Sequence, residues 1–345
     1  MKSILSFLND CELGKKQNCR NLTLFPVLHA NGVEPYYLTL EQAIESGLLT
    51  VTEVDDAGNV NRLKLTNKGS KPILLIEGEE LRGAKQNRIV NASFLIAGKT
   101  TTTIPVSCVE ERRWQYDSPK FSAGKKVMHA SLRREAQSSM CDSLSRGSGH
   151  RSDQSRIWAN IAEKSQRMKV ESPTMAMADV FDHFEDELSV FNEAFDAVED
   201  QVGALFAIDG AVVGMECFAS GETFKLFFDK LIKSYAMDAI ESDQAKTVLS
   251  VPPSKAGAYI ASLQKAEGKR HPRVSLGATV SFQSRIALGT ALVDDDTVLH
   301  LSAFKKADGS NGNQVRFQRF SARRARQTRN TGNGHRSGGG PFLIE

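Results

Sequence analysis

The chain has 345 residues, of which 40% are hydrophobic and 25% are charged, and its formal net charge is +3. This composition is ordinary for a globular protein and excludes a chain that is disordered throughout. No apolar run reaches the roughly 18 to 20 residues needed to cross a bilayer, so we expect no membrane contact.

The N-terminal segment, residues 1–20, begins with a short apolar stretch that soon meets acidic residues. It lacks a small-residue cleavage pattern, so it predicts an amphipathic helix rather than a signal peptide. The five cysteines are an odd number without Cys-x-x-Cys spacing, which argues against a disulfide framework and a zinc finger. Together these features predict a cytoplasmic protein.

Residues 21–115 form a β-rich half. Thr39 and Gln42 fit a capping box that opens a short helix. Residues 49–54 and 60–65 alternate in polarity around a turn-forming Asp-Asp-Ala-Gly-Asn segment, which is typical of a hairpin. We therefore expect an antiparallel β-sandwich or barrel-like sheet in this half.

A dense polar run at 77–88 separates two apolar segments of this half. Apolar stretches at 73–76, 89–96 and 101–108 read as three strands of an up-down-up meander. In such a meander the polar run is a loop at one end, and a second polar cluster, residues 108–114, leaves the third strand at that same end. We therefore expect the two clusters to meet, and this end is the predicted functional site.

The chemistry of the two clusters suits an anionic ligand. Paired carboxylates can divide general acid and base roles or hold a divalent metal, and cations beside glycine-containing backbone suit phosphate. The candidate catalytic groups are Glu79, Glu80 and Glu110. The candidate ligand-binding residues are Lys85, Gln86, Asn87, Arg88, Arg113 and Trp114. The sequence does not specify a cofactor, but Glu79 and Glu80 are the candidate ligands for Mg²⁺.

Structural alternatives accompany each of these assignments. The polar run could be a solvated hairpin tip held by internal ion pairs, and Trp114 could anchor the end of the sheet rather than stack on a flat ring. Cys108 alternates with two apolar residues, which favours a buried structural thiol over an activated nucleophile.

Residues 116–156 are polar and rich in Ser and Arg, which predicts a mobile loop. Residues 157–305 form an α+β half that we expect to build one composite domain with residues 21–115. The expected helices of this half span 157–169, 174–202, 221–240 and 254–266. The expected strands span 202–208, 211–218, 273–282, 285–293 and 297–304, and the first two turn on an Asp-Gly pair.

The whole chain therefore predicts an α+β fold, with an N-terminal antiparallel sheet, a central helical segment, and C-terminal hairpins and helices that pack back on it. Residues 306–345 form a basic Arg/Gly-rich tail that we expect to be disordered. The tail could bind nucleic acid through its arginines or simply keep the protein in solution.

Several common sites are excluded by the sequence. The histidines show no zinc-binding spacing, and the chain has no Walker loop and no Gly-x-Ser-x-Gly elbow. Gly-x-Gly-x-x-Gly does not follow any predicted strand.

The polar motifs resemble a prokaryotic family, the ARG and rhodanese-phosphatase-superfamily-associated protein domain. The resemblance covers roughly residues 20–305. It is carried by residues 77–88, 104–110, 113–114, 201–203, 230–239 and 300–304. The family name refers to genes for ADP-ribosylglycohydrolase and rhodanese-phosphatase proteins, so the resemblance implies a link to ADP-ribose, NAD-derived or phosphate chemistry.

We therefore expect a protein that binds an anionic, nucleotide- or ADP-ribose-related small molecule and hydrolyses or transfers part of it. The alternative is a non-catalytic sensor or scaffold for a partner enzyme in an ADP-ribose-linked or defence system. In that case the same polar end is a protein interface.

Overall fold

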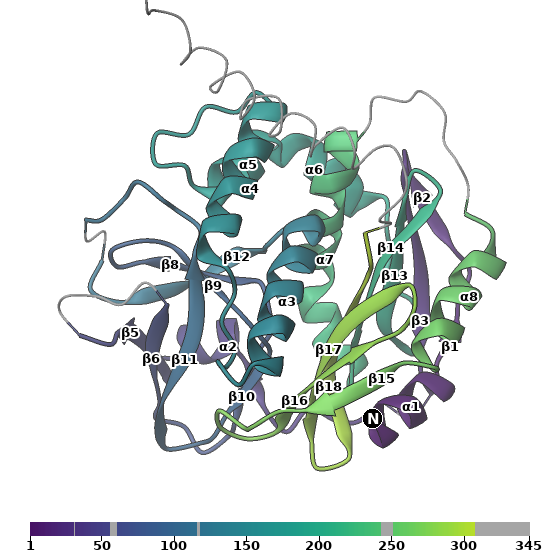
Figure 1. Ribbon diagram of the computed structural model, residues 1–345, viewed down its shortest axis with the longest axis horizontal. Coiled ribbons are helices and arrows are strands. Elements are labelled where there is room, and N and C mark those ends of the chain that lie inside the picture. The colour runs from purple at the N-terminus through teal and green to yellow at the C-terminus, as the bar shows by residue number, and fades with distance from the viewer. Residues whose placement is uncertain (31, 56–60, 116–117, 243–250, 308–345) are drawn as a thin grey trace, which may run out of the picture. The chain divides into compact units, whose positions relative to one another are not determined.

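The C-terminal hairpins build a nine-stranded antiparallel sheet, which lies to the right in Figure 1. Its strand order is β1-β3-β13-β14-β18-β17-β16-β15, and β2 also pairs with β3. The strands are β1 (Glu12–Leu13), β2 (Gln17–Cys19), β3 (Leu22–Leu28), β13 (Gln201–Ile208), β14 (Ala211–Phe218), β15 (Glu267–Arg270), β16 (Ala278–Gln283), β17 (Ala287–Asp294) and β18 (Thr297–Lys305).

Helices cover both faces of this sheet, because alternate strand residues point to opposite sides. In the part of the chain that the structure describes there are eight helices. They are α1 (Lys2–Asn9), α2 (Leu40–Glu45), α3 (Ala130–Ser145), α4 (Gln154–Arg167), α5 (Met177–His183), α6 (Glu185–Glu193), α7 (Gly221–Ser242) and α8 (Pro253–Leu263). On one face Phe206 stacks on Tyr235 of α7, with ring centroids 3.8 Å apart. On the other face Leu205 and Ala207 share a core with α1 and α8.

The N-terminal strands form two smaller sheets that curl into a half-barrel. One sheet has the order β12-β8-β9-β11-β6-β5 and the other the order β10-β7-β4. These strands are β4 (Leu38–Thr39), β5 (Leu49–Glu53), β6 (Arg62–Asn67), β7 (Ile73–Leu75), β8 (Glu79–Gly83), β9 (Arg88–Val90), β10 (Phe94–Ile96), β11 (Thr100–Cys108) and β12 (Phe121–Val127). Their apolar side chains form a core of their own, to which α2 and the end of α3 contribute.

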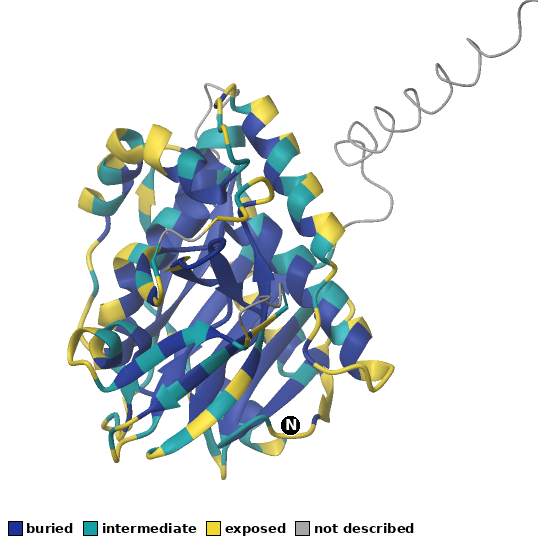
Figure 2. Cartoon of the chain, turned by 90° about the vertical axis from the view of Figure 1, so that its left-hand side faces the viewer, coloured by how far each residue is buried: buried dark blue, intermediate teal, exposed yellow. Residues whose placement is uncertain are grey.

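Helices α3 and α7 lie between the half-barrel and the large sheet (Figure 1). A single apolar core runs from Leu74 and Ile89 of the half-barrel through Leu132 of α3 and Leu231 of α7 to Phe206 of the large sheet. The strands are accordingly buried along most of their length, whereas the outer helices alternate buried and exposed residues (Figure 2). Residues Met1–Lys305 form one unit of the chain, and Lys306–Glu345 form a second unit.

The structure describes residues 1–30, 32–55, 61–115, 118–242 and 251–307. This structure is a computed structural model. The expectation for the basic tail concerns residues that lie almost wholly outside the described ranges. Among the described residues, no helix is both long and apolar enough to span a membrane.

The mixed α+β class, the barrel-like N-terminal sheet, the central helices and the C-terminal strands are confirmed. The capping box at the start of α2 forms, because Thr39 and Gln42 each bond the backbone of the other. The hairpin of β13 and β14 also forms on its Asp-Gly pair. Asp209 and Gly210 have φ angles of 50° and 75°, as a type I′ turn requires.

Three expectations about individual elements are wrong. The segment 116–156, expected to be a mobile loop, contains β12 and α3 in its described part, residues 118–156. The helix expected at 174–202 is two helices, α5 and α6, that meet at Phe184. The strand expected at 89–96 is two short strands, β9 and β10, which pair in different sheets.

Candidate functional site

The polar run 77–88 is not a loop throughout, because its first part forms a strand and only residues 84–87 form the turn that follows it. Its first half is β8, which pairs with β9 on one side and with β12 on the other. Glycines bound this strand at Gly78 and Gly83, whose φ angles of 81° and 120° favour glycine. The carboxylates and amides of the run are therefore placed inside the protein and not at a solvated tip.

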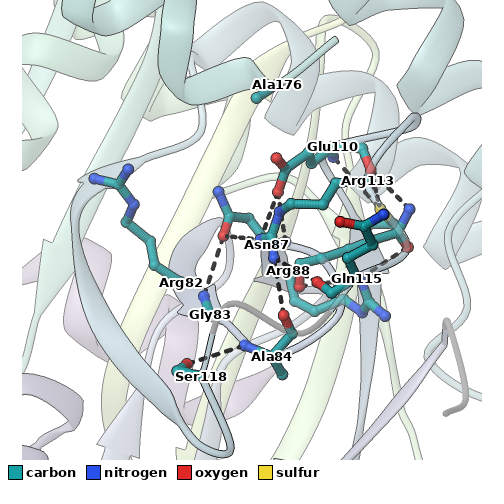
Figure 3. Close-up of polar contacts among 12 residues, drawn as sticks. Arg82, Gly83, Ala84, Asn87, Arg88, Glu110, Arg113, Gln115, Ser118 and Ala176 are labelled. Carbon is teal, nitrogen blue, oxygen red and sulfur yellow. Dashed lines mark hydrogen bonds and ion pairs between the residues drawn. The ribbon is translucent and has the colours of Figure 1, made fainter. Parts of the chain in front are cut away.

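The two polar clusters meet, as expected from the sequence (Figure 3). The side-chain amide of Gln86 donates to the Glu110 carbonyl at 2.8 Å, and the Asn87 backbone N–H donates to the Glu110 carboxylate at 3.2 Å. Arg113 forms an ion pair with Glu110 at 2.7 Å and donates to the Asn87 side chain at 3.0 Å. These contacts tie the end of β11 to the turn that follows β8.

We call the place where the end of β11 meets the turn after β8 the junction, and most of its polar groups bond one another. Burial raises the pKa of Glu110, but hydrogen bonds from Arg113 and Asn87 outweigh burial and leave the pKa below its usual value. Glu110 is thus an ionised carboxylate at neutral pH that accepts internal hydrogen bonds. Such a group is better suited to holding the junction together than to donating a proton.

Arg88 is fully buried, so the expectation that it presents a guanidinium to a phosphate is not supported by its position. Its Nη1 donates to the backbone carbonyl and the side-chain oxygen of Gln86, and its Nη2 lies 3.6 Å from the Glu53 carboxylate. Gln86 and Asn87 are also buried. These three residues form the interior of the junction.

Trp114 lies where the junction approaches solvent, whereas Lys85 beside it is buried. The Trp114 side chain is 46% exposed, and the Lys85 amine lies 5.2 Å from the centre of its ring. Arg113 is half-buried and is held by the Ala84 carbonyl as well as by Glu110. An exposed indole with a cation over its face is available to a partner or a flat ligand.

Glu79 and Glu80 do not share a site, because adjacent residues of a strand point to opposite faces of the sheet. Glu79 lies beside Lys230 of α7, whereas Glu80 lies beside Gly124 of β12. The expectation that this pair holds one Mg²⁺ is therefore wrong. Among the described residues, no group of three or more His, Cys, Asp or Glu side chains is placed to hold a metal ion.

Glu79 lines a surface cleft of about 140 Å³ between α2 and α7. The cleft is lined by Thr39, Glu41, Gln42, Glu45, Glu79, Leu226, Phe227 and Lys230. Lys230 donates to the Glu41 carboxylate at 2.7 Å, and the Ile76 backbone N–H donates to Glu79 at 2.8 Å. The cleft thus combines a buried carboxyl group, an ion pair and uncharged polar side chains.

The pKa of the Glu79 carboxyl group lies near neutral pH. Its side chain is only 2% exposed, and burial raises its pKa to about 7, against the opposing effects of Lys230 and the Ile76 amide. A carboxyl group with this pKa can act either as a general acid or as a general base at physiological pH. The cleft therefore holds the predicted catalytic residue that is best placed for chemistry.

Glu80 also has a raised pKa, but it does not line the cleft that Glu79 lines. Neither of its carboxylate oxygens bonds a described residue, and burial raises its pKa to about 7. Gly124 makes room for this side chain, since a Cβ there would lie 2.6 Å from a carboxylate oxygen of Glu80. Two cations, Arg82 and Lys126, oppose this rise in the pKa, and Lys126 is already paired with Asp182.

Cys108 is a buried thiol, in agreement with the structural alternative. Burial raises its pKa above the usual value despite the nearby guanidinium of Arg88. A protonated, buried thiol is a poor nucleophile.

Sequence reasoning missed a buried polar network between the half-barrel and the large sheet. Arg133 of α3 forms ion pairs with Glu216 at 2.7 Å and with Glu77 at 3.3 Å. Tyr235 and His300 also contact Glu216. Because these residues are far apart in sequence, no local pattern could have assembled them.

Sequence reasoning also missed the partners of Glu79 in the cleft. Lys230 opens one of the motifs that carry the family resemblance, and this was the one signal in the sequence that could have identified it. Thr39 and Gln42 were recognised only as a helix cap, because a capping pattern contains no information on what the helix faces.

Comparison with known proteins gives one match. The sequence model of the ARG and Rhodanese-Phosphatase-superfamily-associated Protein domain matches residues 10–304. No curated protein and no solved structure shows a significant match.

Proposed function

The chain belongs to the ARG and Rhodanese-Phosphatase-superfamily-associated Protein domain family, and from this premise we propose that it binds a nucleotide- or ADP-ribose-related small molecule and hydrolyses or transfers part of it. The reaction takes place in the cleft between α2 and α7. One observation carries the proposal. Glu79, a carboxyl group with a pKa of about 7, lies at the surface of this cleft beside the Lys230–Glu41 ion pair.

In hydrolysis Glu79 acts first as an acid. Its carboxyl O–H gives a proton to the leaving oxygen of the substrate as the bond to that oxygen breaks, and a water molecule adds to the other fragment. The proton that this water loses returns to the Glu79 carboxylate, so that the residue is restored. In transfer an acceptor hydroxyl takes the place of the water.

The family name supports the choice of ligand class, since it associates the domain with ARG and rhodanese-phosphatase proteins. The described cysteines Cys11, Cys19, Cys108, Cys141 and Cys217 are all free thiols, which supports a reducing, cytoplasmic environment.

The test is turnover of ADP-ribose, NAD and linear and cyclic nucleotides by the purified full chain, compared with Glu79→Gln and with Glu163→Gln as a matched exposed control. We expect Glu79→Gln to lower kcat at least 100-fold, since positioned acid–base groups contribute roughly 10²- to 10⁴-fold. We also expect turnover to fall as the pH rises above about 7, because Glu79 then loses the proton that it must donate. Normal turnover by a folded Glu79→Gln protein would contradict the proposal.

Trp114 favours a second candidate function, a sensor or scaffold in an ADP-ribose-linked or defence system. Its 46% exposure beside Lys85 is typical of an aromatic anchor at a protein interface. If the protein is a sensor or scaffold, we expect Trp114→Ala to weaken its binding to a partner enzyme and Glu79→Gln to leave that binding unchanged. Loss of turnover in Glu79→Gln, with partner binding unchanged in Trp114→Ala, supports the catalytic function instead.

A further inference from the structure

We propose that the group entering the cleft is a single hydroxylated sugar ring, and that any phosphate of the same molecule stays outside. This inference rests on the proposed function, since it specifies which part of a nucleotide- or ADP-ribose-related molecule meets Glu79. Four properties of the cleft support it: size, charge, hydrogen-bonding groups and apolar surface.

The size of the cleft limits its occupant to one ring. Its volume of about 140 Å³ is close to the roughly 150 Å³ of an engineered cavity that holds benzene. Pockets that enclose whole drug-sized ligands measure roughly 300 to 1,000 Å³. A complete nucleotide therefore places one of its parts in the cleft and leaves the others at the surface.

The charge of the cleft disfavours phosphate. Three carboxyl groups line it, those of Glu41, Glu45 and Glu79, against the single ammonium group of Lys230. That ammonium group is already paired with Glu41, and only 11% of the Lys230 side chain is exposed. A phosphate would thus meet more negative than positive charge, whereas an uncharged sugar ring meets no such penalty.

The hydrogen-bonding groups suit hydroxyls. Carboxylates accept hydrogen bonds from hydroxyl groups, and Glu45 of α2 is exposed at the cleft. The Gln42 side-chain oxygen accepts from the Thr39 backbone N–H, while its amide nitrogen makes no bond to a described residue and is available to donate. A sugar hydroxyl can donate and accept at once, so it matches this mixed set better than an acceptor-only anion does.

The remaining surface of the cleft is apolar. Phe227 contributes buried ring surface, and the Leu226 side chain is 50% exposed beside it. The C–H face of a sugar ring can cover such a surface and remove it from water. Leu226 is one of few large hydrophobic side chains with this exposure among the described residues, so covering it also accounts for its position.

NMR on the full chain tests this inference with three separate probes: D-ribose and uracil, followed by saturation transfer to their C–H protons, and inorganic phosphate, followed by broadening of its ³¹P signal. The variants are Glu45→Gln, which removes a carboxylate of the cleft, and Glu163→Gln, which removes an exposed one on α4. We expect binding of D-ribose at millimolar concentration, weakened about tenfold by Glu45→Gln, as for the loss of one hydrogen bond to a charged group. Glu163→Gln leaves the binding unchanged.

Three outcomes would overturn the inference. The first is that D-ribose does not bind. The second is that phosphate or uracil binds more tightly than D-ribose, and the third is that Glu45→Gln does not change the binding of D-ribose. The proposed function fails separately, by normal turnover in Glu79→Gln. A protein that depends on Glu79 for turnover but selects uracil would therefore keep the proposed function and lose the sugar assignment.

Discussion

At the scale of single residues, two adjacent buried carboxyl groups, those of Glu79 and Glu80, lie in different surroundings. Glu79 and Glu80 are both buried and both have a pKa raised to about 7, and Glu79 in addition lines the cleft between α2 and α7. A raised pKa is thus not by itself a sign of catalysis here. What distinguishes Glu79 is its place in the lining of the cleft between α2 and α7.

The raised pKa of Glu80 makes stability depend on pH. Its folded-state pKa of about 7 lies above the ordinary value of 4.5, so the stabilisation is fully present below pH 4.5 and is lost as the pH rises to about 7. The loss is about 3 kcal/mol for one group at 1.36 kcal/mol per pKa unit. We therefore expect Glu80→Gln to raise the free energy of unfolding above pH 7 by up to about 3 kcal/mol, with little effect at pH 4.

Urea denaturation of Glu80→Gln and of the wild type across this pH range measures the effect. Glu163→Gln controls for the loss of an exposed carboxylate, since the Glu163 side chain is 62% exposed. The same difference at pH 4 and pH 8 would contradict the assigned protonation of Glu80.

Substitution of Arg133 is expected to lower stability, because it removes the guanidinium that is paired with two buried carboxylates. Arg133→Met exposes the Glu77 and Glu216 carboxylates to one another inside the core. Breaking such a pair costs roughly 3 to 5 kcal/mol. We expect this loss in denaturant unfolding, and a loss below about 1 kcal/mol for the neighbouring half-buried Arg134→Met. Equal effects of the two variants would mean that the buried network is not held by Arg133.

At the scale of elements, the most important feature is that the first part of the polar run 77–88 forms the strand β8. Pairing with β9 and β12 takes the polar run into the interior and fixes which of its side chains face the cleft. The strand ends at Gly83, where a positive φ angle and close contacts coincide. A Cβ at this position would lie 2.4 Å from the Ser118 hydroxyl and 2.8 Å from the Lys120 carbonyl.

Two glycine variants separate backbone strain from steric clash. Gly47 also has a positive φ angle, of 69°, but a Cβ there would meet no atom within 4 Å. We expect Gly47→Ala to cost about 1 kcal/mol of stability from backbone strain alone. Gly83→Ala carries the clash in addition and is expected to cost at least about 2 kcal/mol more. Thermal unfolding of both variants measures this, and equal costs would show that the backbone near Ser118 can relax.

At the scale of the whole molecule, the unit Met1–Lys305 contains every element described above. We expect a chain that ends at Lys305 to keep the Tm and the turnover of the full chain, because every described residue of the three apolar cores lies within this unit. If the arginines of residues 306–345 bind nucleic acid, this deletion abolishes binding that in the full chain falls steeply with salt. A large fall in Tm on deletion would show that the last 40 residues stabilise the fold.

The sequence by itself determined the local features of this protein. The capping box of α2 and the Asp-Gly hairpin of β13 and β14 follow from neighbouring residues. The two polar clusters meet as expected, but the meander from which this was inferred does not form, because β7 pairs with β10 and β4 and the polar run contains β8. The mixed α+β class followed from the order of the elements. Short-range signals suffice for these features because turns and caps are settled within a few residues.

Only the tertiary structure decided which polar groups are buried and which face a cleft. The sequence cannot show that Arg88 is interior, because its burial depends on pairing between β9 and β11 and on cover from other elements. It also cannot place Lys230 and Glu41 beside Glu79, since these three residues come from α7, α2 and β8. The raised pKa of Glu79 results from this long-range packing, which removes water from a carboxyl group that lines a cleft.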